Sequence, residues 1–164
     1  MGNSGIGVPL PELAAYCREA AAEGAVLLKN EGHMLPVKKD ETVSIFGRSQ
    51  IEYYRSGTGS GGAVNVPYVK NILDGIKENN VFPVNEELVE IYKEWLKEHP
   101  FDNGGGGWAA EPWHQAEMEI TDEIARRAAE KSEKAIFLIG RTAGEDKDYE
   151  DTEGSYLLTK REKE

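Results

Sequence analysis

Short apolar runs that alternate with amphipathic helical stretches constrain the fold of this chain most strongly. Val43–Gly47 and Ala135–Ile139 each have the character of a buried strand, and Val81–Val84 is a shorter candidate. Apolar residues at three- and four-residue steps predict helices between and around them, as in Leu10–Leu28 and Glu86–Lys97. This alternation predicts an α/β protein, a three-layer α/β/α sandwich in which helices cover both faces of a mainly parallel sheet.

Local signals define the remaining expected helices. A helical stripe runs from Val66 to Ile76, and Thr121 is placed to cap a helix that ends near Lys131. The helix over Leu10–Leu28 is expected to bury one face, with Cys17 as a packed core thiol.

The sheet expected from these runs is too small to bury its helices. Leu157–Glu162 contains the Thr-x-x-Glu spacing of a helix start, yet only two residues follow it. With two or three strands before this point, we expect residues 1–164 to form a partial, truncated domain or one that depends on a missing partner.

Composition excludes several classes of function. The 164 residues, 39% of them apolar, suit one globular domain, and the net charge of −11 argues against nucleic acid or an anionic membrane as a partner. No apolar run approaches the roughly 20 residues that span a bilayer, and the N-terminus lacks a basic region followed by an apolar one. The cytoplasm is the simplest compartment.

Chemistry is most expected where the run AIFLIG gives way to the acidic loop RTAGEDKD. Ligands of open α/β sheets bind outside the carboxyl ends of the strands, so Glu145 is a candidate catalytic or binding carboxylate. The plain alternative is that Glu145 is one of many acidic residues in this region. Asp146 or Asp148 could tie the loop to Arg141 or Lys147, but no ligand spacing of a calcium loop is present. We expect no metal and no cofactor.

Two glycine-rich segments are the other candidates for function. The stretch Gly57–Gly62, reading GTGSGG, follows the first strand, and a long irregular loop covers about 101–117. That loop has the composition of a functional or mobile insert, with Trp108 and Trp113 beside four consecutive glycines. The two tryptophans could stack on a sugar, although pinning the loop to the domain is the commoner role of large aromatics.

Four motifs in order resemble the second, α/β domain of family 3 glycoside hydrolases, the β-glucosidase group. They are EGAVLLKNEGHMLPV with the strand VSIFG, then GTGSGG, VKNILDGIKEN and AGEDKD. The loop about 101–117 lies outside them. In its usual form this family places a catalytic (β/α)8 barrel before the α/β domain. Because Met1 lies close to the domain start, the chain resembles the bacterial members with the reversed order, although a segment excised from a longer protein would look the same.

The resemblance implies a retaining β-glucosidase-like hydrolase that acts on a β-linked glucoside or oligosaccharide. Glu145 would be the general acid/base, while a barrel of the same polypeptide, absent here, would supply the nucleophile. Ser60, with Gly59 and Gly61, would line the sugar pocket, and the chain alone would be inactive. The sequence departs from the more frequent Gly-Glu-Gly form of the motif by carrying Asp146, which reduces backbone freedom there.

Two other functions stay open. One is a non-catalytic carbohydrate-binding or interaction module with Trp108 and Trp113 as its platform. The other is a nucleotide-binding flavodoxin-like protein, which is weaker because GTGSGG lacks the Walker lysine and the full dinucleotide fingerprint.

Overall fold

The computed structural model describes residues 10–55, 58–59 and 68–164. The chain divides into two compact units. One comprises Met1–Val37 with Asn65–Tyr68, and the other comprises Lys38–Val64 with Val69–Glu164.

The first unit contains α1 (Pro11–Glu23), which begins after Leu10 and ends at Gly24. A helix was expected here, but it is shorter than Leu10–Leu28, because glycine has a low helix propensity and ends it. Ala14 is half-buried, and every other side chain of α1 is exposed, including Cys17. The prediction of a buried face with a packed thiol is therefore wrong. Apolar spacing marks the side of a helix that can pack, whereas burial also needs an opposing surface.

The second unit contains the sheet. β1 (Val43–Phe46) pairs in parallel with β2 (Lys134–Phe137), and Phe46 lies opposite Phe137. β1 is buried as expected, but the prediction of a buried strand over Ala135–Ile139 is wrong, since Phe137 is 69% exposed and Ile139 is 49% exposed. The candidate strand Val81–Val84 is reduced to a single parallel bridge between Val84 and Val43. Pro83 has no N–H for a strand ladder, which limits pairing at this point. In the described residues the sheet thus has two parallel strands, and the α/β class is confirmed.

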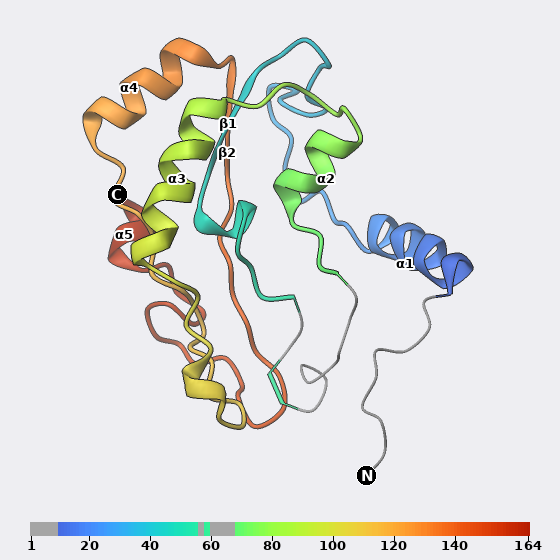
Figure 1. The fold of residues 1–164 in the computed structure, drawn as a ribbon, viewed down its shortest axis with the longest axis vertical. Helices are drawn as coiled ribbons and strands as arrows, with labels where there is room; N and C mark the ends of the chain where they lie inside the picture. Colours follow the sequence, from blue (N-terminus) through green and yellow to red (C-terminus); the bar gives the residue numbers. More distant parts are fainter. Residues whose placement is uncertain (1–9, 56–57, 60–67) are drawn as a thin grey trace. The chain divides into compact units, whose positions relative to one another are not determined.

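Two helices pack against β1 and form the core with it (Figure 1). They are α3 (Glu86–Glu98), capped by the Asn85 side chain, and α4 (Asp122–Lys131), capped by Thr121 as predicted. The buried cluster between them and the sheet consists of Phe46, Leu88, Tyr92, Met118 and Ala128. Full burial of a large apolar side chain contributes about 1.5–3 kcal/mol, so this cluster fixes the end of β1 that leads to the site.

The helix expected over Val66–Ile76 begins later than predicted. α2 spans Ile72–Glu78, because the Asn71 side chain accepts a hydrogen bond from the Asp74 backbone and starts the helix there. Val66 lies outside the described residues.

The predicted insert, 101–117, is irregular, and its two ends are tied to the residues that follow β1. Arg48 is 1% exposed, and its guanidinium donates to the His99 carbonyl at 2.9 Å and to the Ala116 carbonyl at 3.0 Å. Gln115 closes the same base, accepting from the Asp102 N–H at 2.7 Å and donating to the Asp102 carbonyl at 2.9 Å. The insert therefore leaves the body of the domain from a fixed base.

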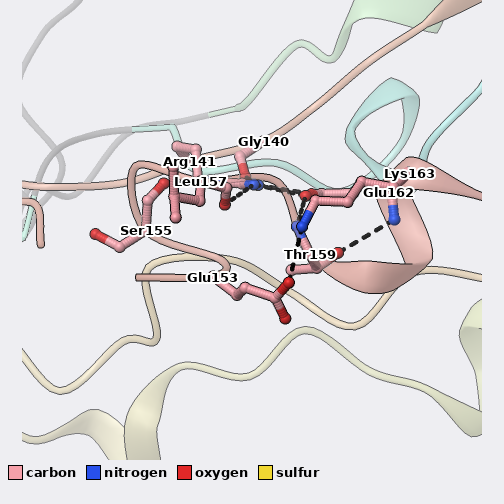
Figure 2. Close-up of polar contacts among 8 residues, drawn as sticks. All are labelled: Gly140, Arg141, Glu153, Ser155, Leu157, Thr159, Glu162 and Lys163. Atoms are coloured by element: carbon pink, nitrogen blue, oxygen red, sulfur yellow. Dashed lines mark hydrogen bonds and ion pairs between the residues drawn. The ribbon is translucent and has the colours of Figure 1, made fainter. Parts of the chain in front are cut away.

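The C-terminal segment is tied to the residues that follow β2 (Figure 2). Arg141 donates to both carboxylate oxygens of Glu162, at 2.7 and 2.6 Å, and their side chains are 14% and 6% exposed. Glu162 also completes the predicted capping box with Thr159 at the start of α5 (Lys160–Lys163). Burial by itself would raise the pKa of Glu162, but the hydrogen bonds from Arg141 and Thr159 outweigh it and lower that pKa.

Candidate active site

Glu145 lies at the tip of a tight turn beyond the end of β2. The turn is closed on both sides, because Gly144 N–H donates to the Lys147 carbonyl and Lys147 N–H donates to the Gly144 carbonyl, each at 3.1 Å. Glu145 and Asp146 are its two middle residues, and Glu145 is exposed. Asp146 has a φ of 59°. Turns of this kind that need a positive φ at the third position favour glycine there.

The turn lies against Thr58 and Gly59, the two described residues of the glycine-rich stretch. Thr58, which is 4% exposed, forms a parallel bridge with Gly144, and its N–H donates to the Ala143 carbonyl at 3.4 Å. Gly59 has a φ of 86°, and a Cβ at this position would lie 2.6 Å from Glu145 Cβ and 2.8 Å from its Oε2. The glycine therefore permits direct contact between the backbone at position 59 and the Glu145 side chain.

The structure thus brings together two of the residues singled out in the sequence, Gly59 and Glu145. Ser60 and Gly61 lie outside the described residues. The catalytic role of Glu145 and the sugar-binding roles of Ser60, Gly59 and Gly61 stay predictions.

The two tryptophans of the insert direct their indole N–H groups at the loop that carries Glu145. Trp108 Nε1 donates to Asp146 Oδ2 at 2.9 Å, and Trp113 Nε1 donates to the Asp148 carbonyl at 3.1 Å. The Thr142 N–H donates in turn to the Trp113 carbonyl at 3.0 Å. Trp108 keeps 58% of its surface exposed. The geometry thus pins the insert to the domain, and it leaves much of the Trp108 ring accessible.

Lys147 makes the reciprocal contacts from the turn to the insert. Its ammonium donates to the Glu111 carbonyl and, at 3.4 Å, to the Ala109 carbonyl. It also lies 5.5 Å from the centre of the Trp113 ring, within the range of a cation–π contact. Arg141, the other cation considered for this loop, instead pairs with Glu162.

A cavity of about 410 Å³ shares Thr58 with this site. Its lining includes Tyr53, Tyr54, Arg55 and Glu111, a mixture of aromatic and charged groups. Burial raises the pKa of Tyr54 to about 12, so its hydroxyl stays protonated, and it donates to the Pro112 carbonyl. Among the described residues, Glu145 does not line this cavity, and we assign the cavity no catalytic role.

Within the described parts of the chain, no group of three or more His, Cys, Asp and Glu side chains is arranged to hold a metal ion. Among the same residues, no helix has the length and apolar character to cross a membrane.

Sequence reasoning missed Thr58, and it named Asp146 and Lys147 without their partners in the insert. Thr58, Asp146 and Lys147 make its defining contacts through groups that no local pattern reveals, since their partners lie far away in the sequence. The one available signal was at position 146, where an aspartate stands in place of the more frequent glycine.

Comparisons with known proteins identify the family of the chain. Residues 25–162 match the model of the glycosyl hydrolase family 3 C-terminal domain. The chain is 52% identical over 145 residues to a β-glucosidase from Ruminococcus albus and 33% identical over 128 residues to β-glucosidase A from Butyrivibrio fibrisolvens. These matches cover 88% and 77% of this chain but 15% of each relative.

Solved structures give the same result. A β-glucosidase from Paenibacillus barengoltzii superposes with a TM-score of 0.93 at 65% identity, over 98% of this chain and 17% of that one. β-Glucosidase 3B from Thermotoga neapolitana, solved in complex with glucose, has a TM-score of 0.76 at 29% identity, over 93% of this chain and 21% of that one. The chain therefore spans a small part of the proteins that it matches, and it belongs to glycosyl hydrolase family 3, as part of the C-terminal domain.

Proposed function

We propose that this chain supplies the general acid/base, Glu145, and part of the sugar pocket to a retaining β-glucosidase-like hydrolase. A (β/α)8 barrel of the same polypeptide would bring the nucleophilic carboxylate. The observation that carries the proposal is the position of Glu145, exposed at the tip of a closed turn and in contact range of Gly59. The relatives named as β-glucosidases support the reaction class.

In retaining hydrolysis the two catalytic carboxyl groups can come from different domains, so this chain needs to supply only the general acid/base. The reaction needs two carboxyl groups about 5–5.5 Å apart, one to attack the anomeric carbon and one to protonate the departing oxygen. Glu145 would donate the proton in the first step and, as a carboxylate, activate water in the second. A docked domain that removes solvent and brings a second carboxylate favours the protonated starting form.

The substrate would be a β-linked glucoside or oligosaccharide. Ser60 would donate a hydrogen bond to a sugar hydroxyl, while Gly59 and Gly61 allow close approach of the backbone. The chain alone would be inactive, because it lacks the attacking group. The cytoplasmic location stays a prediction.

Replacing Glu145 by Ala in the full-length polypeptide tests the proposal. We expect kcat/KM to fall by roughly 100-fold or more for substrates with poor leaving groups, which need protonation, and much less for a dinitrophenyl glucoside. Azide should restore kcat with the activated substrate, because a small anion attacks the glycosyl-enzyme without a general base. Unchanged activity across all leaving groups would remove Glu145 from this role.

Because the Trp108 ring is exposed, one alternative function stays open, a non-catalytic carbohydrate-binding module. Titration of the 164-residue chain with glucose or cellobiose separates the two functions. Binding that Trp108→Ala abolishes favours the module, whereas binding that appears only after a barrel domain is added favours a shared active site.

A further inference from the structure

We propose that the insert, 101–117, is a positioning device for the acid/base, with Trp108 and Trp113 as positioning residues. They would hold the turn that carries Glu145 in place, working with Asp146 and Lys147. This inference rests on the proposed function of Glu145.

The contacts between the insert and the turn run in both directions. Trp108 and Trp113 donate their indole hydrogens to Asp146 and to the Asp148 carbonyl. Lys147 donates back to carbonyls at positions 109 and 111. Each of these hydrogen bonds is partly exposed and therefore weak alone, but together they attach the three residues that follow Glu145. We call this set of contacts the clasp.

The turn has a specific need for the Trp108 contact. Asp146 holds a φ of 59°, a left-handed conformation that costs an L-residue more than it costs glycine. Its side chain is also the acceptor for the indole at 2.9 Å. Aspartate therefore gives up backbone freedom at this position and provides an anchor that glycine lacks. Because residue 146 directly follows Glu145, this anchor acts on the adjacent peptide.

The insert can serve as a support because its own path is defined. Its base is held by Arg48 and by the paired amide of Gln115. Its middle is held by Tyr54, whose hydroxyl donates to the Pro112 carbonyl and accepts from Gln115 Nε2 at 2.8 Å. The turn Gly104–Gly106 has φ values of 64°, 71° and 76° and leads the chain back toward Trp108.

The clasp matters because proton donation by Glu145 requires a precise position of its carboxyl group. A proton donor must be held within about 0.5 Å of its productive position, and irregular loops rarely achieve this without support from neighbouring residues. The contacts of the clasp leave Glu145 exposed while fixing the residues that follow it. The clasp thus positions Glu145 without covering it.

The experiment removes single contacts and reads out proton donation in the full-length polypeptide. Trp108→Phe and Trp113→Phe each delete one N–H while keeping an aromatic ring. Asp146→Gly removes the acceptor but keeps a residue suited to positive φ, and Asp146→Asn keeps an acceptor. Trp95→Phe is the matched control, because Trp95 lies in α3, outside the clasp, and its indole stacks on His99 at 4.3 Å between ring centres. kcat/KM is measured for a series of aryl β-glucosides of increasing leaving-group pKa.

We expect Trp108→Phe and Asp146→Gly to lower kcat/KM for the poorest leaving groups by roughly 10-fold, with less than a 2-fold change for a dinitrophenyl glucoside. Asp146→Asn and Trp95→Phe should stay within roughly 2-fold of the parent protein throughout the series. The double variant Trp108→Phe/Asp146→Gly should lose no more than either single variant, since both delete the same contact. A merely structural role predicts a different result, an equal loss for every substrate.

The controls separate this proposal from the one on which it rests. If Glu145→Ala shows no dependence on the leaving group, the acid/base assignment fails and takes the clasp with it. If Glu145→Ala behaves as expected while Trp108→Phe leaves the series unchanged, or lowers it uniformly, the clasp alone is overturned.

Discussion

Replacing Gly59 by Ala should damage proton donation through a steric contact whose size follows from the structure. The new Cβ would lie 2.6 Å from Glu145 Cβ, whereas carbon atoms pack at about 3.5–4.0 Å. A Cβ atom moves only with its backbone, so rotation of the Glu145 side chain cannot relieve this overlap. The turn therefore has to shift by about 1 Å.

A shift of that size at a reacting group can cost roughly 100-fold in rate. We expect this loss in kcat/KM for substrates with poor leaving groups and only a small change for a dinitrophenyl glucoside. Disturbance of the neighbouring Ser60 would have another signature. It would weaken sugar binding equally for all these substrates, which share the same glucosyl group.

Gly32→Ala is the matched control. Gly32 has a φ of 76°, close to that of Gly59, but a Cβ there meets no atom within 4 Å. Both substitutions place an L-residue at a positive φ, which costs about 1–2 kcal/mol, whereas only Gly59→Ala pushes on Glu145. Equal kinetics for the two variants, or a uniform loss in Gly59→Ala, would refute the reasoning.

Two further predictions concern stability, measured by chemical denaturation across pH. Burial raises the pKa of Glu117 to about 7, so its contribution is complete below about pH 4.5 and is lost as pH rises through 7, by on the order of 2–3 kcal/mol. Glu117→Gln should abolish that component, and a wild-type-minus-variant difference that is flat with pH would contradict it. Glu162→Gln should destabilise by about 3 kcal/mol at neutral pH, because it breaks a buried pair with Arg141. The pKa of Glu162 is lowered, so the destabilisation caused by Glu162→Gln should fade as the pH falls through that pKa. The control is Glu130→Gln, in the exposed pair with Arg126, which should change stability by less than about 0.5 kcal/mol. Equal effects at the two sites would contradict the burial argument.

The sequence was sufficient where the determining signals are local. Thr121 caps α4 as predicted, and both strands lie within two residues of their expected bounds. Capping spacing and apolar periodicity act within one or two turns of chain, so they can be read without knowing the fold.

Prediction was wrong or incomplete where burial depends on distant partners. The apolar residues of α1 have the spacing of a packed face, yet Leu13 is 56% exposed and Cys17 is exposed as well. Periodicity cannot indicate whether the opposing surface belongs to the same unit of the chain.

The position of the candidate catalytic residue could be predicted from the sequence, but the contacts that support it could not. The position of Glu145 beyond a strand could be inferred from the order of elements. Its support could not, because Trp108 and Asp146 are 38 residues apart and Thr58 is 87 residues from Glu145. Hydrogen bonds between residues so far apart in the chain leave no periodic pattern in the sequence.

The turn Gly104–Gly106 has a stereochemical consequence. A glycine run is commonly regarded as a spacer that tolerates any small residue and any length, but here three successive positions have positive φ. D-Alanine is the natural probe at Gly105 and Gly106, because the mirror-image residue prefers this half of backbone space. L-Alanine is the matching comparison, because its Cβ would meet no atom within 4 Å at either position and it differs in backbone preference. Chemical ligation with the D-residue would make the segment more rigid, whereas L-alanine at the same position would strain it. Handedness, rather than flexibility, is what these glycines contribute to the protein.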